Sequence, residues 1–218
     1  MKTDSNNSLM HSRREFTSAV LLETEIPSDP MELLLGWYKT AVDRGVSDAN
    51  AMSLSTIDHD GYPVSRIVLL RDASREGLSF FTNYQSAKGM EIEVNPRAAV
   101  QFFWQALERQ VRVRGRVVRV SEAESDAYFA SRPRDSQIGA WASRQSEVLA
   151  SRETLEDAVE SYREKFKDLS AIPRPPHWGG YRLVPDIFEF WQGRPSRLHD
   201  RLRATQKNEG WTWERLSP

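Results

Sequence analysis

The chain has 218 residues, 39% hydrophobic and 10% aromatic, which is enough for a sizeable core and typical of one globular domain. Its 30 lysines and arginines nearly balance 31 aspartates and glutamates, so no global field would recruit nucleic acid or an acidic membrane, and any anion site must be local. The absence of cysteine excludes disulfides, thiolate metal sites and cysteine nucleophiles. No apolar run approaches the ~20 residues of a membrane span and no signal-peptide core opens the chain, so we expect a cytoplasmic protein with no membrane or nucleic-acid partner.

The first part of the chain predicts a tail, a helix and several strands. Residues 1–12 are polar and patternless, so we expect a disordered tail followed by a single domain over residues 13–218. Asp29 and Pro30 are typical of a helix N-cap and first turn, which predicts a helix to Gly45. β-rich runs separated by turn residues then predict an antiparallel meander, with strands at 51–57, 64–70 and 78–83 and turns at 58–61 and 72–77.

The middle of the chain combines a short helix with two further strands. Ser86 is expected to cap a helix that ends at Asn95-Pro96, and strand patterns follow at 98–104 and 110–120. In the second pattern, valines and Gly115 share one face. The opposite face is polar, with Gln110, Arg112, Arg114 and Arg116. The alternation slips at Val117-Val118, which predicts a β-bulge.

The last third of the chain predicts two amphipathic helices and the final strands. Ser121 and Glu124 form a capping box for a helix to about Arg132, and another helix is expected to begin near Ser151. The final strands are expected at 178–184, 187–193 and 211–216. Five to seven strands with inserted helices and no strict βαβ alternation favour an antiparallel barrel of the α+β class. No Gly-rich dinucleotide motif or P-loop occurs, so side chains and strand ends must hold any nucleotide.

One segment, residues 134–146, is unusually polar. Its two arginines, two glutamines and three serines surround only four apolar side chains. Arginine forks and hydroxyls match the oxygens of a polyanion, whereas a solvated helix end would have the same composition. The two interpretations have equal weight from the sequence.

Other charged residues are weaker indicators of a site. Arg66 and Arg71 bracket an apolar strand, and their odd spacing sends them to opposite faces, so solvated edge charges explain them as well as ligand binding does. Lys88 follows a helix N-cap, a plausible phosphate seat but a common arrangement. The arginine stripe at 112–116 fits an exposed face or a subunit contact better than nucleic acid. The four histidines are too scattered to propose a metal site.

A second cluster lies near the C-terminus and favours a functional site. Arg197, His199 and Arg201 stand at alternating positions after Trp191. In an extended segment these side chains can point one way, which would give a cationic, proton-carrying surface beside an aromatic plane.

These segments together resemble the pyridoxamine 5′-phosphate oxidase family. The motifs RIVLLR, FFTNYQSAKG, LERQVRVRG, SRPRDSQIGAWASRQS, FEFWQG and RLHDR occur in family order between about Arg13 and Pro218. The resemblance implies an α+β fold, the FMN-binding antiparallel split β-barrel with peripheral helices. It also implies a homodimer with both active sites at the subunit interface.

The resemblance assigns most candidate site residues. FMN binding is implied for Arg66, Ile67, Val68, Leu69, Leu70, Arg71, Phe81, Thr82, Lys88, Gln110, Gln145, Ser146, Trp191 and Arg201. Substrate binding is implied for Arg13, Arg14, Phe16, Arg71, Tyr128, Arg132, Ser136, Arg197 and His199. Of these, Arg197 and His199 are the catalytic candidates, for orientation and proton handling, and the sequence does not decide which of them acts as a base.

The implied reaction is oxidation of pyridoxamine 5′-phosphate or pyridoxine 5′-phosphate to pyridoxal 5′-phosphate. Hydride passes from the substrate C4′ to flavin N5, water hydrolyses the imine formed from the amine, and dioxygen reoxidises the flavin to give hydrogen peroxide. The protein's part is to hold ring on ring at reacting distance.

Three residues depart from the family pattern. Arg71 stands where lysine is usual, Ala87 where an arginine commonly grips the FMN phosphate, and Phe16 where a tyrosine of the N-terminal arm is usual. We therefore expect weakened FMN binding that Ala87→Arg would strengthen. A flavin enzyme with another ring substrate and a non-catalytic FMN or pyridoxal phosphate binding protein are the alternatives, and a nucleic-acid module would require steeply salt-dependent binding.

Overall fold

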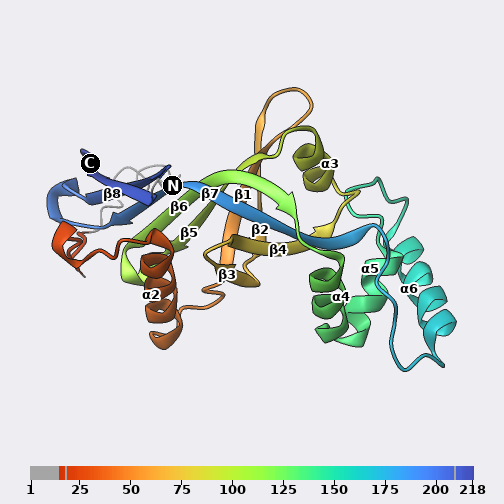
Figure 1. Ribbon diagram of the computed structural model, residues 1–218. Helices are drawn as coiled ribbons and strands as arrows, with labels where there is room; N and C mark the ends of the chain where they lie inside the picture. Colours follow the sequence, from red (N-terminus) through yellow and green to blue (C-terminus); the bar gives the residue numbers. More distant parts are fainter. Residues whose placement is uncertain (1–14, 18, 209) are drawn as a thin grey trace, which may run out of the picture.

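An antiparallel sheet that curls into a half-barrel, with helices at its periphery, organises the chain (Figure 1). The computed structural model describes residues 15–17, 19–208 and 210–218. The strands are β1 (Ala51–Ile57), β2 (Pro63–Leu69), β3 (Asp72–Ser74), β4 (Gly77–Asn83), β5 (Arg97–Trp104), β6 (Arg109–Arg119), β7 (Trp178–Gln192), β8 (Asp200–Lys207) and β9 (Gly210–Arg215). The helices are α2 (Pro30–Asp43), α3 (Ala87–Val94), α4 (Glu122–Ser131), α5 (Arg134–Ala142) and α6 (Arg152–Phe166), with 3-10 turns η2 (Glu23–Glu25), η3 (Gln105–Leu107) and η4 (Pro195–Arg197). The expected α+β antiparallel split barrel is confirmed.

Strand β7 is the spine of the sheet. One edge pairs with β6 over most of its length, from Gln192 opposite Arg109 to Tyr181 opposite Arg119. On the other edge, the first part of β7 pairs with β4 and the last part with β8. At about 3.3 Å per residue, Trp178 and Trp191 are separated by roughly 40 Å of strand. In Figure 1, β7 runs from the β8 hairpin to the side of the molecule that carries α4, α5 and α6.

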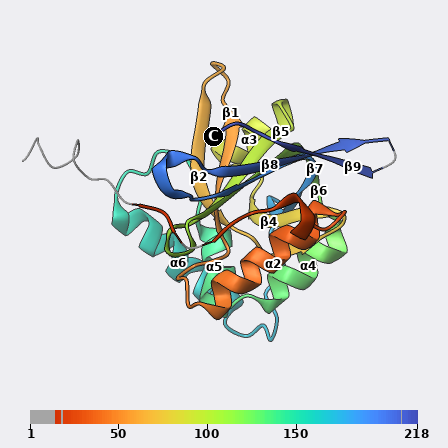
Figure 2. The same ribbon diagram turned by 90° about the vertical axis from the view of Figure 1, so that its left-hand side faces the viewer.

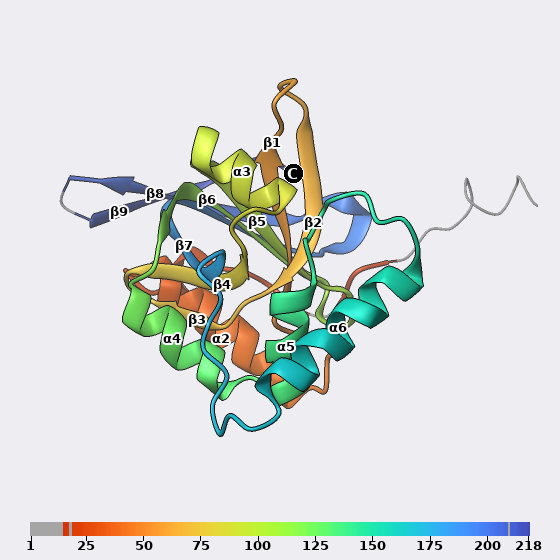
Figure 3. The same ribbon diagram turned by 90° about the vertical axis from the view of Figure 1, so that its right-hand side faces the viewer.

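The two ends of the molecule are covered by different elements. Seen from one side, α2 and the β8–β9 hairpin lie in front (Figure 2), and from the opposite side α5 and α6 do (Figure 3). Helix α2 packs on the inner face of the sheet, where Trp37 meets Phe190 edge-on at 5.4 Å between ring centroids. Phe80, Phe102 and Phe188 are fully buried in the same core.

Local capping signals place four helices where the sequence predicts them. Asp29 accepts a hydrogen bond from the Met31 amide at the start of α2. Ser86, Ser121 and Ser151 cap α3, α4 and α6, and the capping box at Ser121 is complete. Each cap satisfies backbone N–H groups that a helix N-terminus leaves without partners.

The expected meander is wrong in its pairing. β1 and β2 form a hairpin, but β1 then pairs with β5, and β4 pairs with β7 on the far side of the sheet. Part of the expected turn at 72–77 is the strand β3, which pairs with β4. Turn chemistry marks where the chain reverses but does not say which strands meet after the sheet curls.

Three strand predictions need correction at the C-terminal end. The expected strands at 178–184 and 187–193 are one strand, β7, and the expected bulge at Val117-Val118 lies instead opposite Gly115. There the register shifts because Asp186 is an extra residue on β7, next to Pro185, which has no N–H to donate. Strand β8 was not expected, and the described residues form nine strands where five to seven were predicted.

Some predictions fall outside this description. The tail expected over residues 1–12, and the substrate residues Arg13 and Arg14, lie outside the described residues. Within the described ranges, no helix is both long and apolar enough to cross a membrane.

Candidate functional site

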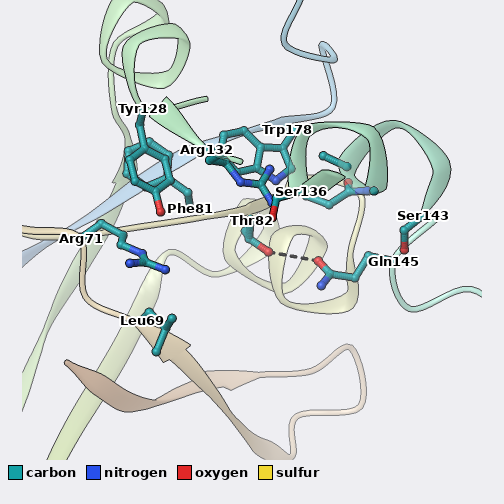
Figure 4. A pocket seen from close by; sticks show the side chains of 13 residues that line it. Leu69, Arg71, Phe81, Thr82, Tyr128, Arg132, Ser136, Ser143, Gln145 and Trp178 are labelled. Carbon is teal, nitrogen blue, oxygen red and sulfur yellow. Dashed lines mark hydrogen bonds between the residues drawn. The ribbon is translucent and has the colours of Figure 1, made fainter. Parts of the chain in front are cut away.

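A cavity of about 410 Å³ opens at the Trp178 end of β7 (Figure 4). It lies where the end of β4 meets α4 and α5, because the pairing of β4 with β7 brings Thr82 opposite Gly179. Its lining residues are Leu69, Arg71, Phe81, Thr82, Asn83, Tyr128, Arg132, Ser136, Gly139, Ala140, Ser143, Gln145 and Trp178. Eight of the residues that the sequence assigned to FMN or substrate are among them.

Three aromatic rings form one wall of this cavity. Phe81 stacks on Tyr128 with 3.9 Å between centroids, and the Tyr128 and Trp178 rings are nearly parallel at 6.1 Å. The rings come from β4, α4 and β7, so three elements fix one planar surface. Such a surface is a rigid support for the groups that project from it.

Two arginines face this cavity, and neither forms an ion pair with a carboxylate among the described residues. Arg132 lies over the Trp178 ring at 4.6 Å, and Arg71 lies 5.8 Å from the Tyr128 ring centroid. Burial lowers the pKa of Arg132, and the charge of Arg71 lowers it further. Its Nη1 atom is buried and makes no hydrogen bond in the described chain. A buried, unpaired guanidinium beside a second cation is a receptor for an anion, and the hydroxyl of Ser136 lies in the same lining.

A second cationic group borders the cavity. Thr82 donates a hydrogen bond to the Gln145 side chain at 3.1 Å, and Lys88 Nζ lies 3.4 Å from the same oxygen. Burial lowers the pKa of Lys88, and the charge of Arg66 lowers it further. Ser146 follows in a left-handed conformation with φ of 76°. The structure thus brings Lys88 close to Gln145 and couples it to Arg66.

The remaining β2 residues of the candidate FMN set differ in exposure. Ile67 is 66% exposed and Leu69 is 37% exposed, whereas Leu70 is buried. Val68 packs against the hydrophobic core. Arg66 and Arg71 are not brought together, because β2 ends at Leu69 and Arg71 faces the cavity from beyond it.

Some residues of the polar segment 134–146 fit an anion site, and others stabilise a helix end. Ser136, Ser143 and Gln145 line the cavity. Arg134 instead donates to the carbonyl oxygens of Phe166 and Leu169 at the end of α6. Its charge stabilises a helix C-terminus.

A second constellation lies at the Trp191 end of β7. Gln110, Trp191 and Arg201 are side by side on β6, β7 and β8. The His199 ring lies 4.7 Å from the Trp191 ring, and Phe16 meets both rings edge-on at 5.5 and 5.7 Å.

His199 has a fixed orientation. Its Nδ1 accepts a hydrogen bond from the Arg194 amide at 3.1 Å, which leaves the proton on Nε2 when the ring is neutral. Burial lowers the pKa of His199, and the charge of Arg197 lowers it further. Both effects favour the neutral ring.

The segment that carries Arg197 is not extended as the sequence predicts. Pro195–Arg197 form a 3-10 turn in which Ser196 and Arg197 have left-handed φ angles of 56° and 61°. Arg201 lies on β8 and donates two hydrogen bonds to Glu189, at 3.2 and 2.8 Å. In this turn Arg197 is exposed to solvent, and it does not share one face of an extended segment with Arg201.

Sequence reasoning missed the residues that fasten the N-terminal strap, residues 15–17 and 19–25, over this end. Arg215 donates to Asp200, to Glu23 and to the Leu21 carbonyl, and Asp200 also accepts from the Leu21 amide. The Thr17 amide donates to Glu108 at 2.9 Å. Asp200 and Glu108 lie in the family motifs RLHDR and LERQVRVRG, but no local pattern indicates this role for either of them.

The two constellations lie at opposite ends of β7. Each holds part of the residues that the sequence assigned to one site. The arginine stripe lies outside the cavity. Arg112 lies 3.6 Å from Glu189, the carboxylate that also binds Arg201, and Arg114 lies 3.1 Å from Asp186. Among the described residues, no three histidine, aspartate or glutamate side chains gather in a way that could hold a metal ion.

Known proteins resemble the chain over nearly its whole length. The family model described as pyridoxamine 5′-phosphate oxidase matches residues 38–166, and that of the pyridoxine 5′-phosphate oxidase C-terminal dimerisation region matches residues 178–218, which supports a homodimer. The pyridoxine/pyridoxamine 5′-phosphate oxidase of Cupriavidus taiwanensis is 53% identical over 207 residues, 94% of this chain and 97% of that protein. Its namesake from a Cyanothece species is 48% identical over 94% of this chain and 96% of that protein.

Solved structures share the fold. PhzG from Burkholderia lata, in complex with tetrahydrophenazine-1-carboxylic acid, has a TM-score of 0.86 and 32% identity, covering 93% of this chain and all of that one. A pyridoxamine 5′-phosphate oxidase-related, FMN-binding protein from Nostoc punctiforme has a TM-score of 0.69 at 16% identity over 88% of this chain and all of that one, a likeness of fold. Family and fold together point to a flavin cofactor. On these matches, this chain belongs to the pyridoxamine 5′-phosphate oxidase family.

Proposed function

We propose that this protein is an FMN-dependent oxidase that converts pyridoxamine 5′-phosphate and pyridoxine 5′-phosphate to pyridoxal 5′-phosphate. Dioxygen accepts two electrons and becomes hydrogen peroxide, and the amine substrate also consumes water and releases ammonia. The observation that carries this proposal is the cavity with two cations that have no carboxylate partner in the described chain, Arg71 and Arg132. A substrate phosphate would satisfy the buried Nη1 of Arg132 and relieve its repulsion from Arg71.

The residues present fit an FMN phosphate next to that cavity. Lys88 and Arg66 are two coupled cations, and Thr82, Gln145 and Ser146 add polar groups. When bound, FMN supplies the acceptor for a hydride. The chain's own residues would hold the phosphate at one end, while Gln110, Trp191 and Arg201 would address the ring system from strands β6, β7 and β8.

The site we propose requires two subunits. Arg71, Tyr128, Arg132 and Ser136 lie at the Trp178 end of β7, and the catalytic candidates Arg197 and His199 lie at the other end. Roughly 40 Å of strand separates these ends, whereas a substrate and a flavin in contact need both within a few ångströms. A homodimer in which the Trp191 end of one subunit meets the Trp178 end of its partner would complete two sites at the interface.

Within that site, Arg197 and His199 would orient the pyridine ring. A neutral His199 with its proton on Nε2 can donate to an oxygen of the substrate, and Arg197 can neutralise charge that develops beside it. Phe16 on the strap would exclude water from the same side, without the hydroxyl that a tyrosine would offer.

A second candidate is a flavin oxidase of another ring substrate. The 32% identical PhzG structure, in complex with tetrahydrophenazine-1-carboxylic acid, favours this reading. The two arginines of the cavity favour a phosphate instead, because a phosphate monoester carries more charge and more acceptor oxygens than a single carboxylate. A non-catalytic FMN or pyridoxal phosphate carrier would show the same binding without turnover.

Anaerobic mixing of the FMN-loaded protein with pyridoxamine 5′-phosphate tests the proposal. We expect the visible flavin absorbance to bleach and to recover when air is admitted, with hydrogen peroxide formed in equal amount to pyridoxal 5′-phosphate. Flavin that stays oxidised with both phosphorylated substrates would contradict the proposal and favour another substrate or a binding role. A protein that takes up no FMN would contradict the cofactor assignment itself.

A further inference from the structure

A closed triangle of polar side chains joins α3 to the β1–β2 hairpin. Arg66 Nη2 lies 2.8 Å from Glu91 Oε2, and Arg66 Nη1 donates to the Thr56 hydroxyl. That hydroxyl in turn donates to the same oxygen of Glu91. The side chains of Arg66 and Glu91 are only 22% and 11% exposed, so the ion pair is shielded from solvent.

Lys88 lies close to this triangle, three residues before Glu91 on α3. The charge of Arg66 and burial lower the pKa of Lys88, with burial the larger cause, and the charge of Glu91 opposes them. Three charges are therefore coupled at one place, two positive and one negative. Ala87, beside Lys88, adds no cation.

The charge sum at this place matters for a phosphate ligand. A phosphate monoester carries about −1.5 to −2 charges at pH 7. Arg66 and Lys88 alone would balance it, but Glu91 lowers the sum of the three side chains to about one positive charge, by the ordinary ionisation of these groups. We propose that Glu91 sets how strongly this site prefers a phosphorylated flavin, by orienting Arg66 while weakening the field that the phosphate meets. This inference rests on the proposed FMN function and names a specificity-determining residue within it.

The geometry lets Arg66 serve both partners. A guanidinium has five N–H donors, and the bonds to Glu91 and Thr56 use two of them. A glutamine at position 91 could still accept from Arg66 through its side-chain oxygen. Glu91→Gln thus removes the charge and keeps the orientation.

The test compares FMN with riboflavin, which lacks the phosphate. Flavin-free wild type and Glu91→Gln would be titrated with each flavin, and binding followed by quenching of flavin fluorescence. We expect the ratio of FMN to riboflavin affinity to rise about five- to tenfold in the variant at low salt, because one repulsive charge is gone. Riboflavin affinity should not change, and the gain should shrink at high salt.

Glu93→Gln is the matched control. Glu93 lies on the same helix but points to Arg119, with 2.6 Å between charged atoms, and its side chain is half exposed. Glu93→Gln removes the same charge from α3, and we expect no change in the ratio of FMN to riboflavin affinity. If thermal unfolding shows that Glu91→Gln folds poorly, Glu91→Met carries the same expectation for charge.

The possible failures are distinct. Flavin uptake with an unchanged or lower affinity ratio in the Glu91 variants overturns the role of Glu91 and leaves the proposed function standing. An equal rise of the affinity ratio in Glu93→Gln also overturns the role of Glu91, since the effect would then come from net charge. No uptake of either flavin by any of the proteins would contradict the proposed function and this inference together.

Discussion

The two ends of β7 differ in how their arginines are balanced. At the Trp178 end, Arg71 and Arg132 face a cavity with no carboxylate partner in the described residues. At the Trp191 end, Arg201 is bound to Glu189, and Arg215 to Glu23 and Asp200. The first end has charge available for an anion, whereas at the second end Arg201 and Arg215 hold strands and strap in place and Arg197 is exposed on its turn. A ligand with a charged part and a planar part would need both ends of β7.

This contrast between the two ends of β7 explains how the residues of one proposed site can be divided between the ends of a single strand. The matched dimerisation region, residues 178–218, begins at Trp178 and includes all of β7, β8 and β9. The strand that separates the two constellations therefore belongs to the region that joins two subunits. In the homodimer that we propose, residues that are separate within one chain would lie close together across the interface.

Removing a cation from the Trp178 end should have the largest effect. In Arg132→Met, we expect kcat/KM for pyridoxamine 5′-phosphate to fall about 100-fold, because a charge-assisted bond to the phosphate is lost. The activity with unphosphorylated pyridoxamine should change little. Steady-state kinetics with both substrates measures this, and Arg152→Met, on the exposed side of α6, is the control. Equal losses with both substrates would contradict a phosphate role.

Disturbing the strap should have an intermediate effect at the other end. A Cβ added at Gly193 would lie 2.8 Å from the Phe16 ring, so Gly193→Ala must displace that ring from Trp191 and His199. We expect turnover to fall about tenfold, since misplacing a positioning group by an ångström costs up to 100-fold. FMN affinity should stay within twofold if it depends mainly on the phosphate end.

Gly36→Ala is the matched control for the strap variant. Nothing lies within 4 Å of a Cβ at Gly36, which is inside α2. We expect Gly36→Ala to raise the free energy of unfolding by roughly 0.5–1 kcal/mol and to leave the kinetics unchanged. Full activity in Gly193→Ala would show that the Phe16 ring has no part in positioning.

The smallest effect is expected where the strap is fastened. Bonds to Arg215 hold the pKa of Glu23 down at about 2, from an ordinary 4.5. Because the folded-state pKa is depressed, the stabilisation is present above pH 4.5 and is lost as the pH falls toward 2. The melting temperature of Glu23→Gln should therefore lie slightly below that of wild type at pH 7, and the gap should narrow below pH 4.5. A gap independent of pH would mean that the carboxylate charge is not what stabilises the strap.

Sequence reasoning located the features that depend on neighbouring residues. Asp29, Ser86, Ser121 and Ser151 each cap a helix through a bond within three residues, so their roles can be read locally. The alternation of valines and arginines on β6 was equally readable.

Features that depend on distant partners were not predictable in this way. The bulge at Asp186 exists because β7 must stay paired with β6 around Pro185, and a Cβ at Gly115 would lie 1.9 Å from the Val184 oxygen. From the sequence alone Arg134 fits an anion ligand, but in the fold it donates to two carbonyl oxygens at the end of α6. Spacing alone singled out Arg197, His199 and Arg201, and most of the other site residues came from family motifs. No local pattern indicates that the candidate residues gather at two ends of one strand.

Complementation between two inactive variants tests the shared site most directly. Arg132→Met damages the Trp178 end and Arg197→Met the Trp191 end. After the two proteins are mixed, unfolded and refolded together in equal amounts, about half the dimers should be hybrids, each with one intact site. We expect activity with pyridoxamine 5′-phosphate to rise to about one quarter of the wild-type value. Activity no higher than the average of the two parents would contradict a site built from both subunits.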